Sequence, residues 1–372
     1  MILKHDCRYF SGDRPCKFHK EEGVVCSDCS HYSPKGKMIL VIKLDALGDV
    51  LRTTSILHSL KEAHSDSYVS WLTKANAVDI FKNNTLVDEV LVYENTHVTS
   101  VLSIVEYDIL INLDPSPVSS SLASFANAKT KLGFGIDLKG NVYPFNKEAE
   151  EWFEMGAFDN LKSKNTKTYQ QIIHEICSLP YNKGPIIFNL TEEESLFAKE
   201  FYNKNSLSKF KKIIGINAGA SNRWEFKKWR LEGYAELMKT LNRKYNCAFL
   251  LFGSKNEKGI NDYLTKECKN VFDTGSNNTL REFASYIDLC DVLITGDTLA
   301  LHVATALKVP TVCIFGPTSN AEIEDYGLVR KVFPDIDCLV CYKNKCDFKP
   351  NCMELVTTDM VLNETINILE NK

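Results

Sequence analysis

The sequence Thr295-Gly296-Asp297-Thr298-Leu299-Ala300-Leu301-His302-Val303-Ala304 marks a predicted turn from a strand to a helix. The short apolar run Asp291–Ile294 precedes it and is typical of a buried parallel strand. A helix over 299–308 and a strand over 310–315 are predicted to follow. Ligands of open α/β sheets bind outside the carboxyl ends of the strands, where a helix N-terminus attracts phosphate. The turn therefore predicts a phosphate site, with simple helix capping by Asp297 and Thr298 as the alternative.

Strands and helices alternate along most of the chain, which predicts an α/β fold with two doubly wound parallel sheets. Further strands are predicted at 37–43, 68–72, 89–93, 107–113, 212–217, 247–254 and 271–273. Further helices are predicted from the turn at 44–50 to about 62, and at 75–83, 192–203, 231–245, 279–289 and 357–371. The stretch 135–185 is predicted to be less regular.

The predicted chain has four parts. These are a Cys-rich segment (1–36), a first Rossmann-like domain (37–188), a second Rossmann-like domain (189–335), and a Cys-rich loop with a final helix (336–372). We expect the two Rossmann-like domains to face a central cleft that holds the ligand.

The composition is that of an ordinary globular protein, with 44% hydrophobic and 25% charged residues among 372. The formal net charge of −4 argues against a broad basic surface for nucleic acid. No apolar run reaches the length of a membrane span, and the first residues do not have a signal-peptide pattern. We therefore expect a cytoplasmic protein that does not bind nucleic acid.

The 13 cysteines are unevenly distributed. Eight of them form two clusters, Cys7, Cys16, Cys26 and Cys29 near the start and Cys338, Cys341, Cys346 and Cys352 near the end. In a reducing compartment, clustered cysteines are more often metal ligands than disulfides, and four thiolates suit a structural zinc or iron ion. Histidines 5, 19 and 31 are alternative ligands in the first cluster. A loosely ordered cap with free thiols is the alternative to a metal there. The other five cysteines are single and predicted to lie in the core.

Four landmarks together resemble glycosyltransferase family 9, the heptosyltransferases of lipopolysaccharide synthesis, over roughly residues 37–372. They are Lys43–Val50; Asn217–Ser221 with Lys227 and Trp229; Gly296–Ala306 with Phe315–Thr318; and Cys352-Met353. The resemblance implies the two-domain GT-B fold and transfer of a sugar, with inversion, from a nucleotide donor. The usual donor is ADP-heptose, the acceptor is a lipopolysaccharide core or another cell-surface glycan, and no divalent ion is required.

The resemblance also implies roles for individual residues. Asp49 is similar to the general base, and the first turn of a helix is where the dipole favours a carboxylate. Lys227 is similar to the cation that neutralises the departing diphosphate. The implied donor-site residues are Ser221, Glu257, Asp297, Thr298 and His302, with Glu257 on the ribose and His302 as a packing landmark.

Two departures and several alternatives accompany this resemblance, and the first departure is that the Cys-rich residues 1–36 are not part of the family pattern. The family often has Gly where Leu299 stands, so a Cβ restricts how closely phosphate approaches that position. The alternatives are another nucleotide-sugar donor, a protein acceptor, or a non-catalytic metal-thiolate scaffold on a degenerate GT-B fold. A lipid-linked acceptor implies peripheral contact with the inner membrane, for which the Lys-rich stretch Lys162–Lys167 is a candidate.

Overall fold

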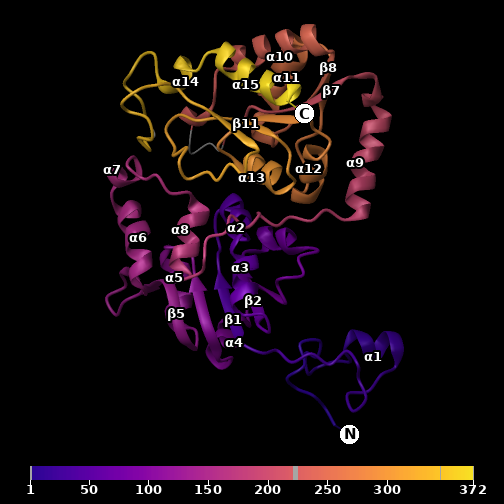
Figure 1. Cartoon of the computed structure of the whole chain (residues 1–372), viewed down its shortest axis with the longest axis vertical. Helices are drawn as coiled ribbons and strands as arrows, with labels where there is room; N and C mark the ends of the chain where they lie inside the picture. The colour runs from indigo at the N-terminus through magenta and orange to yellow at the C-terminus, as the bar shows by residue number, and fades with distance from the viewer. Residues whose placement is uncertain (1, 221–224, 344, 372) are drawn as a thin grey trace. The chain divides into compact units, whose positions relative to one another are not determined.

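The computed structural model describes residues 2–220, 225–343 and 345–371, and the chain divides into two compact units (Figure 1). The first unit comprises the stretches up to Asp45, Ile56–Phe153 and Ile173–Gly184. The second comprises Ala46–Ser55, Glu154–Ile172 and the chain from Pro185 on. The units interleave along the chain, so they do not test the single domain boundaries predicted from the sequence.

The first unit is built on a sheet with the strand order β3-β2-β1-β4-β5-β6. Strands β1 to β5 run parallel, and β6 is antiparallel to β5 at one edge. Their bounds are β1 Met38–Ile42, β2 Tyr68–Thr73, β3 Glu89–Val92, β4 Tyr107–Asn112, β5 Ala128–Ile136 and β6 Val142–Pro144. Leu40 and Leu110 on one face pack against Val98 and Leu102 of α4, so this part of the sheet is buried under helices.

The helices of the first unit are short. They are α1 Lys17–Glu22, α3 Ile56–Ala63, η1 Ala75–Phe81, α4 Val98–Ile104, α5 Pro117–Phe125 and η2 Lys147–Ala149, where η denotes a 3₁₀ helix. Two further helices, α6 Glu150–Ala157 and α8 Tyr169–Ile176, contain residues of both units.

The second unit is built on an entirely parallel sheet with the order β12-β11-β10-β7-β8-β9. Its strands are β7 Lys212–Asn217, β8 Cys247–Leu251, β9 Val271–Asp273, β10 Val292–Gly296, β11 Thr311–Ile314 and β12 Val329–Val332. Alternate residues face opposite sides. Ile216 and Ile294 join the core formed with α10 and α15, whereas Cys313 packs with Leu301 of α13.

Helices cover both faces of this second sheet. In Figure 1, α10, α11 and α15 lie together, and α12 and α13 lie on the opposite side of the strands. The helices of this unit are α2 Leu47–Thr53, α7 Asp159–Lys162, α9 Glu192–Lys204, η3 Leu207–Lys209, η4 Glu225–Lys227, α10 Leu231–Tyr245, η5 Lys255–Glu257, α11 Lys258–Glu267, α12 Leu280–Ile287, α13 Leu299–Ala306, α14 Cys352–Leu355 and α15 Thr358–Glu370.

Both sheets have the doubly wound strand order 3-2-1-4-5-6. In the second sheet the strands are counted from β7 as the first to β12 as the sixth. This confirms the predicted α/β class with two Rossmann-like parallel sheets. In such a sheet the order reverses between the first and fourth strands, and the crevice outside their carboxyl ends takes the ligand. In the second unit those strands are β7 and β10. Within the described ranges, none of the helices is long and apolar enough to cross a membrane.

The single helix predicted from the turn at 44–50 to about 62 is wrong, because the chain forms α2 and α3 with a break at Thr54 and Ser55. The Thr54 and Ser55 hydroxyls donate to the carbonyls of Leu51 and Arg52. The N–H of Ile187 also donates to the Thr54 hydroxyl at 2.8 Å. Such side-chain bonds to the backbone compete with the helix.

The helix predicted at 75–83 forms as a 3₁₀ helix over 75–81. One other local prediction needs correction. The supposedly less regular stretch 135–185 contains β6, α6, α7 and α8. By contrast, the five single cysteines are buried as predicted, at Cys177, Cys247, Cys268, Cys290 and Cys313.

Candidate functional site

Polar side chains gather where β7 and β10 end, at the switch point of the second sheet. The Asn217 amide donates to the hydroxyls of Thr295 at 3.0 Å and Thr298 at 3.2 Å. The two hydroxyls also lie 3.1 Å apart. Thr298 occupies the N-cap of α13 but makes no side-chain capping bond there. The capping alternative is therefore wrong for Thr298, whose hydroxyl joins the two strand ends instead.

Asp297 and Lys227 form a largely buried ion pair. Lys227 Nζ lies 2.8 Å from Asp297 Oδ2 and 3.2 Å from the Asp297 carbonyl oxygen. Burial alone would raise the pKa of Asp297, but the Lys227 ammonium opposes this and holds that pKa below its ordinary value. Trp229 anchors the lysine's turn, because its buried indole donates to the carbonyl of Val356 at 2.9 Å. The two predicted residues thus meet in one place.

Asp49 lies in the first turn of α2, as predicted. Its carboxylate accepts a long hydrogen bond from the Ala46 N–H at 3.4 Å and pairs with Arg52 at 2.9 Å. The Arg52 guanidinium stacks 3.7 Å from the ring centroid of Tyr169. Burial alone would lower the pKa of Arg52, but the Asp49 charge raises it, so the guanidinium stays charged. The sequence interpretation missed Arg52, although its spacing of three from Asp49 on a helix was a usable signal.

His302 of α13 packs directly against α2. A Cβ built on Gly48 would lie 2.9 Å from His302 Cδ2 and 3.7 Å from the Leu299 Cα. Gly48 thus permits the close approach of the two helices. Burial, and to a smaller extent the Arg52 charge, lower the pKa of His302 to about 4. The histidine is therefore neutral at pH 7.

The surroundings of His302 connect the two halves of the candidate site. Four charged groups influence its pKa, namely Arg52, Asp297, Asp49 and Lys227. Electrostatic influence of this kind falls off within a few ångströms to about 10 Å. Asp49 follows Gly48, which lies against His302, so the first turn of α2 packs on α13 within the same compact unit.

Glu257 lies beside the end of β7. Its carboxylate accepts hydrogen bonds from the Ser254 N–H at 2.8 Å and the Ser254 hydroxyl at 2.6 Å. A Cβ built on Gly219 would lie 2.3 Å from Glu257 Cγ, so the glycine admits the side chain. Glu257 is buried, and it occupies the N-cap of α11 next to the strand end at which the donor is predicted to bind. Ser221, the remaining predicted donor residue, lies outside the described residues.

The turn Gly316–Ser319 after β11 holds polar groups that the sequence interpretation did not assign. The Thr318 hydroxyl is buried and finds no hydrogen-bond partner of good geometry among the described residues. It helps to lower the pKa of Asp297, so it lies next to that carboxylate. Unsatisfied buried hydroxyls are rare and often mark a ligand site.

Glu322 and Tyr342 extend this polar region. Glu322 is buried, and burial raises its pKa although Arg52 opposes the shift. The Tyr342 hydroxyl donates to Glu322 Oε1 at 3.1 Å and accepts from the Ser319 N–H at 3.2 Å. Both residues stand in irregular segments, and although Tyr342 directly follows Cys341, the sequence interpretation assigned neither residue to the donor site.

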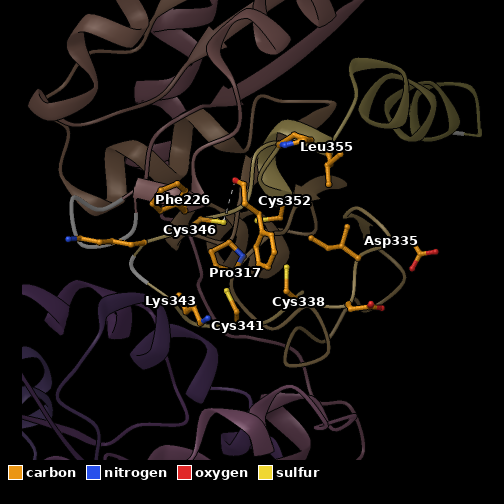
Figure 2. A pocket seen from close by; sticks show the side chains of 14 residues that line it. Phe226, Pro317, Asp335, Cys338, Cys341, Lys343, Cys346, Cys352 and Leu355 are labelled. Carbon is orange, nitrogen blue, oxygen red and sulfur yellow. Dashed lines mark hydrogen bonds between the residues drawn. The ribbon is translucent and has the colours of Figure 1, made fainter.

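The late cysteine cluster lines one cavity of about 470 Å³. Figure 2 shows the side chains of Cys338, Cys341, Cys346 and Cys352 pointing into it. Burial raises the pKa of the Cys352 thiol to about 11, and the other three sulfurs add to this shift. Four thiols on one loop fit a tetrahedral zinc or iron ion by number and type.

The early cysteine cluster lies in the first unit. Cys7 is buried and forms an antiparallel bridge with Pro34, and Cys16 precedes α1. Arg8 anchors the segment through its ion pair with Asp88 at 3.0 Å. All 13 cysteines are free thiols. As the side chains of the described residues stand, no three His, Cys, Asp or Glu groups are placed to hold a metal ion, so metal binding at both clusters stays a prediction.

The sequence pattern of glycosyltransferase family 9 (heptosyltransferase) matches residues 97–351, which is more than half of the chain. The chain belongs to glycosyltransferase family 9. Two relatives of this family-9 chain are lipooligosaccharide heptosyltransferases 2 of Campylobacter jejuni, from serotypes O:2 and O:6. They are 26% and 30% identical, over 47% and 45% of this chain and 56% and 55% of the relatives. The chain thus spans about half the length of these relatives.

Solved structures of the same fold cover nearly the whole family-9 chain. The family 9 glycosyl transferase from Veillonella parvula DSM 2008 is 20% identical, with a TM-score of 0.70 over 90% of this chain and 98% of that one. The E. coli ADP-heptose lps heptosyltransferase II is 20% identical, with a TM-score of 0.63 over 90% and 99% of the two chains. The resemblance predicted from four landmarks is confirmed.

Proposed function

We propose that this protein transfers heptose from ADP-heptose to a lipopolysaccharide-core or other cell-surface glycan acceptor, inverting the anomeric carbon. Family membership supports the reaction class, and the heptosyltransferase names of its relatives support the sugar. The observation that carries the proposal is the largely buried Lys227–Asp297 pair at the switch point, together with the packing of α2, which carries Asp49, against α13. A displacement at a sugar carbon needs a base for the acceptor and a cation for the leaving diphosphate.

Asp49 serves as the base in this proposal. The acceptor hydroxyl gives its proton to the Asp49 carboxylate while its oxygen attacks the anomeric carbon of heptose. The bond from that carbon to the diphosphate oxygen breaks, and ADP leaves with the electron pair. Arg52 acts as a positioning residue, because its ion pair with Asp49 and its stacking on Tyr169 orient the carboxylate.

Lys227 and the turn after β10 serve the donor. The Lys227 ammonium neutralises the charge that develops on the departing diphosphate, and Asp297 holds the ammonium in place at 2.8 Å. The backbone N–H groups that follow Thr298 belong to the first turn of α13 and can donate hydrogen bonds to phosphate oxygens. Glu257 accepts hydrogen bonds from the ribose hydroxyls, and Ser221 is proposed at the phosphates. His302, neutral and buried, packs α13 against α2 rather than carrying charge.

Transfer by this site needs no divalent ion in our proposal, because Lys227 and a helix N-terminus supply the positive potential. The acceptor side is proposed to contact the inner membrane peripherally. Lys162 is a poor candidate for that contact. Its ammonium pairs with Asp159 at 2.9 Å and lies 4.6 Å from the ring centroid of Tyr342.

The first test is ligand-induced stabilisation of the purified chain by ADP, UDP and GDP. A ligand that binds only the native state raises its stability, so ADP alone should raise the midpoint of thermal unfolding. Asp297→Ala should abolish that rise. Asp49→Asn should keep the ADP effect and lose heptose transfer in an assay with ADP-heptose and a lipopolysaccharide-core acceptor. Equal stabilisation by UDP or GDP would contradict the proposed donor, and full transfer by Asp49→Asn would contradict the proposed base.

A further inference from the structure

Tyr169, the first residue of α8, contacts α2 at two points. The Arg52 guanidinium stacks on its ring, 3.7 Å from the ring centroid. Its hydroxyl lies 2.7 Å from the hydroxyl of Thr53, the last residue of α2. Arg52 in turn pairs with the Asp49 carboxylate at 2.9 Å. One tyrosine therefore supports two neighbouring residues of the helix that carries the proposed base.

The direction of the hydroxyl bonds follows from the single proton that each hydroxyl has. The Thr53 hydroxyl lies 2.6 Å from the Asp49 carbonyl oxygen, which has no proton to give, so Thr53 donates to it. The Tyr169 hydroxyl therefore donates to the Thr53 oxygen. Two hydrogen bonds in series lead from Tyr169 to the main chain of Asp49, and buried bonds in series strengthen each other.

The first turn of α2 depends on this support. The helix has only seven residues, and Ala46 at its N-cap makes no side-chain capping bond. A helix of this length is not stable by its own hydrogen bonds, so tertiary contacts fix it. Thr53 is 0% exposed and Tyr169 is 2% exposed, so water does not replace the hydrogen bond between them.

Tyr169 is held on its other side by the segment between β11 and β12. Its N–H donates to the Glu322 carbonyl at 2.9 Å, and the hydroxyl of the preceding Thr168 donates to Glu324 at 3.4 Å. The N–H of Glu322 donates to the Ser319 hydroxyl at 3.3 Å. The helix α2, Tyr169 and this segment belong to one compact unit, so the tyrosine is a fixed support for the helix.

We propose that Tyr169 is a positioning residue that fixes Asp49 from two sides, its carboxylate through Arg52 and its main chain through Thr53. Tyr169 itself takes no proton and binds neither substrate. Base catalysis requires the carboxylate to stay within hydrogen-bond reach of the acceptor hydroxyl, and a displacement of about 1 Å slows a reaction about a hundredfold. The effect on transfer rests on the proposed function, whereas the fixing of α2 does not.

The test removes the two hydroxyls separately and together. Tyr169→Phe keeps the ring and should lower kcat for heptose transfer about three- to tenfold, the effect of one lost hydrogen bond. Thr53→Val should lower kcat at least as much, and the double variant should be no slower than Thr53→Val, because both residues act through one series of bonds. Thr53→Ser keeps the hydroxyl and should retain the parent rate. The affinity for ADP should stay unchanged in all four variants, which separates positioning of the base from a general loss of structure.

Tyr286→Phe is the matched control. Tyr286 is also a buried tyrosine, 7% exposed, but it packs against Phe197 and Phe201. Its variant should keep the parent kcat. Tyr169→Leu also removes the ring under Arg52 and should lower kcat roughly ten- to hundredfold. Equal kcat in Tyr169→Phe and Tyr286→Phe would overturn the effect of Tyr169 on the base.

Hydrogen exchange at the amides of α2 gives a readout that needs no substrate. Tyr169→Phe should speed this exchange, and Tyr286→Phe should not. Unchanged exchange in Tyr169→Phe would overturn the fixing of α2 whatever the activity of the chain. Faster exchange in Tyr169→Phe, in a chain whose parent form transfers no heptose, would support the fixing of α2 and contradict the proposed function.

Discussion

Replacing Lys227 by Met removes the cation from its ion pair with Asp297. The side chains of Lys227 and Asp297 are 16% and 18% exposed. Removing one partner of a fully buried pair costs about 3–5 kcal/mol, because a charge is left without compensation. The residual exposure reduces this, so we expect a loss of about 2–3 kcal/mol in the free energy of unfolding. The double variant Lys227→Met/Asp297→Asn should recover most of the loss, since it removes both charges.

The same substitution should weaken ADP binding. A hydrogen bond to a charged group contributes about 1.5–3 kcal/mol, which corresponds to roughly 10- to 150-fold in the dissociation constant. Adenosine, which lacks the diphosphate, should bind the variant and the parent chain alike. Lys239→Met is the matched control, because Lys239 pairs with Glu267 at 2.9 Å but is 48% exposed. Such surface pairs contribute about 0–1 kcal/mol.

The assays are urea unfolding, followed by fluorescence and circular dichroism, and calorimetric titration of both ligands. The pKa of Asp297 is lowered in the folded chain, so the pair stabilises the fold above the ordinary carboxyl pKa. This stabilisation is lost as the pH falls through the folded value, and the stability gap between variant and parent should narrow in acid. A folded Lys227→Met chain that binds ADP as tightly as the parent would refute this reasoning. A coupling energy near zero between Lys227 and Asp297, obtained from the unfolding free energies of the single and double variants, would also refute it.

Three further predictions concern the contacts around α2. The pKa of His302 is lowered to about 4. The unfolded chain therefore binds more protons between that pH and the ordinary value near 6.5, so stability should fall by about 3 kcal/mol as the pH decreases across this window. His302→Gln should reduce the dependence of the unfolding free energy on pH, measured by urea unfolding. An unchanged dependence would show that other groups cause it. Gly48→Ala should destabilise by about 1–3 kcal/mol, because its Cβ would lie 2.9 Å from His302. Gly259→Ala in α11, with nothing within 4 Å, should be neutral or stabilising, and equal effects would contradict the packing argument. Arg52→Lys should slow transfer about tenfold or more while ADP affinity is kept, since lysine lacks the planar group that stacks on Tyr169. An unchanged rate of transfer would contradict the proposed role of Arg52 in positioning Asp49.

The strand ends could be predicted because local sequence and chain order determine them. Apolar β-branched runs followed by small polar residues specify where β7 and β10 end, and parallel strands bring those ends to one edge of the sheet. Asn217 and Asp297 could therefore each be assigned to the carboxyl end of a strand from the sequence, whereas the pairing of those two strands came from the structure. The helix break after Thr53 could not, because one of its hydrogen bonds comes from Ile187, far along the chain.

The sequence by itself determined the α/β class, the family landmarks and the strand-to-helix turn that holds Asp297, since these follow from periodicity and from residues close in the chain. Only the tertiary structure decided that Thr298 binds Asn217 instead of capping, and that Lys227 pairs with Asp297. It alone also placed Glu322 and Tyr342 beside the site. The physical reason is that these contacts join irregular segments distant in sequence, whose approach is set by the packing of helices on the sheet and leaves no periodic signal in the chain.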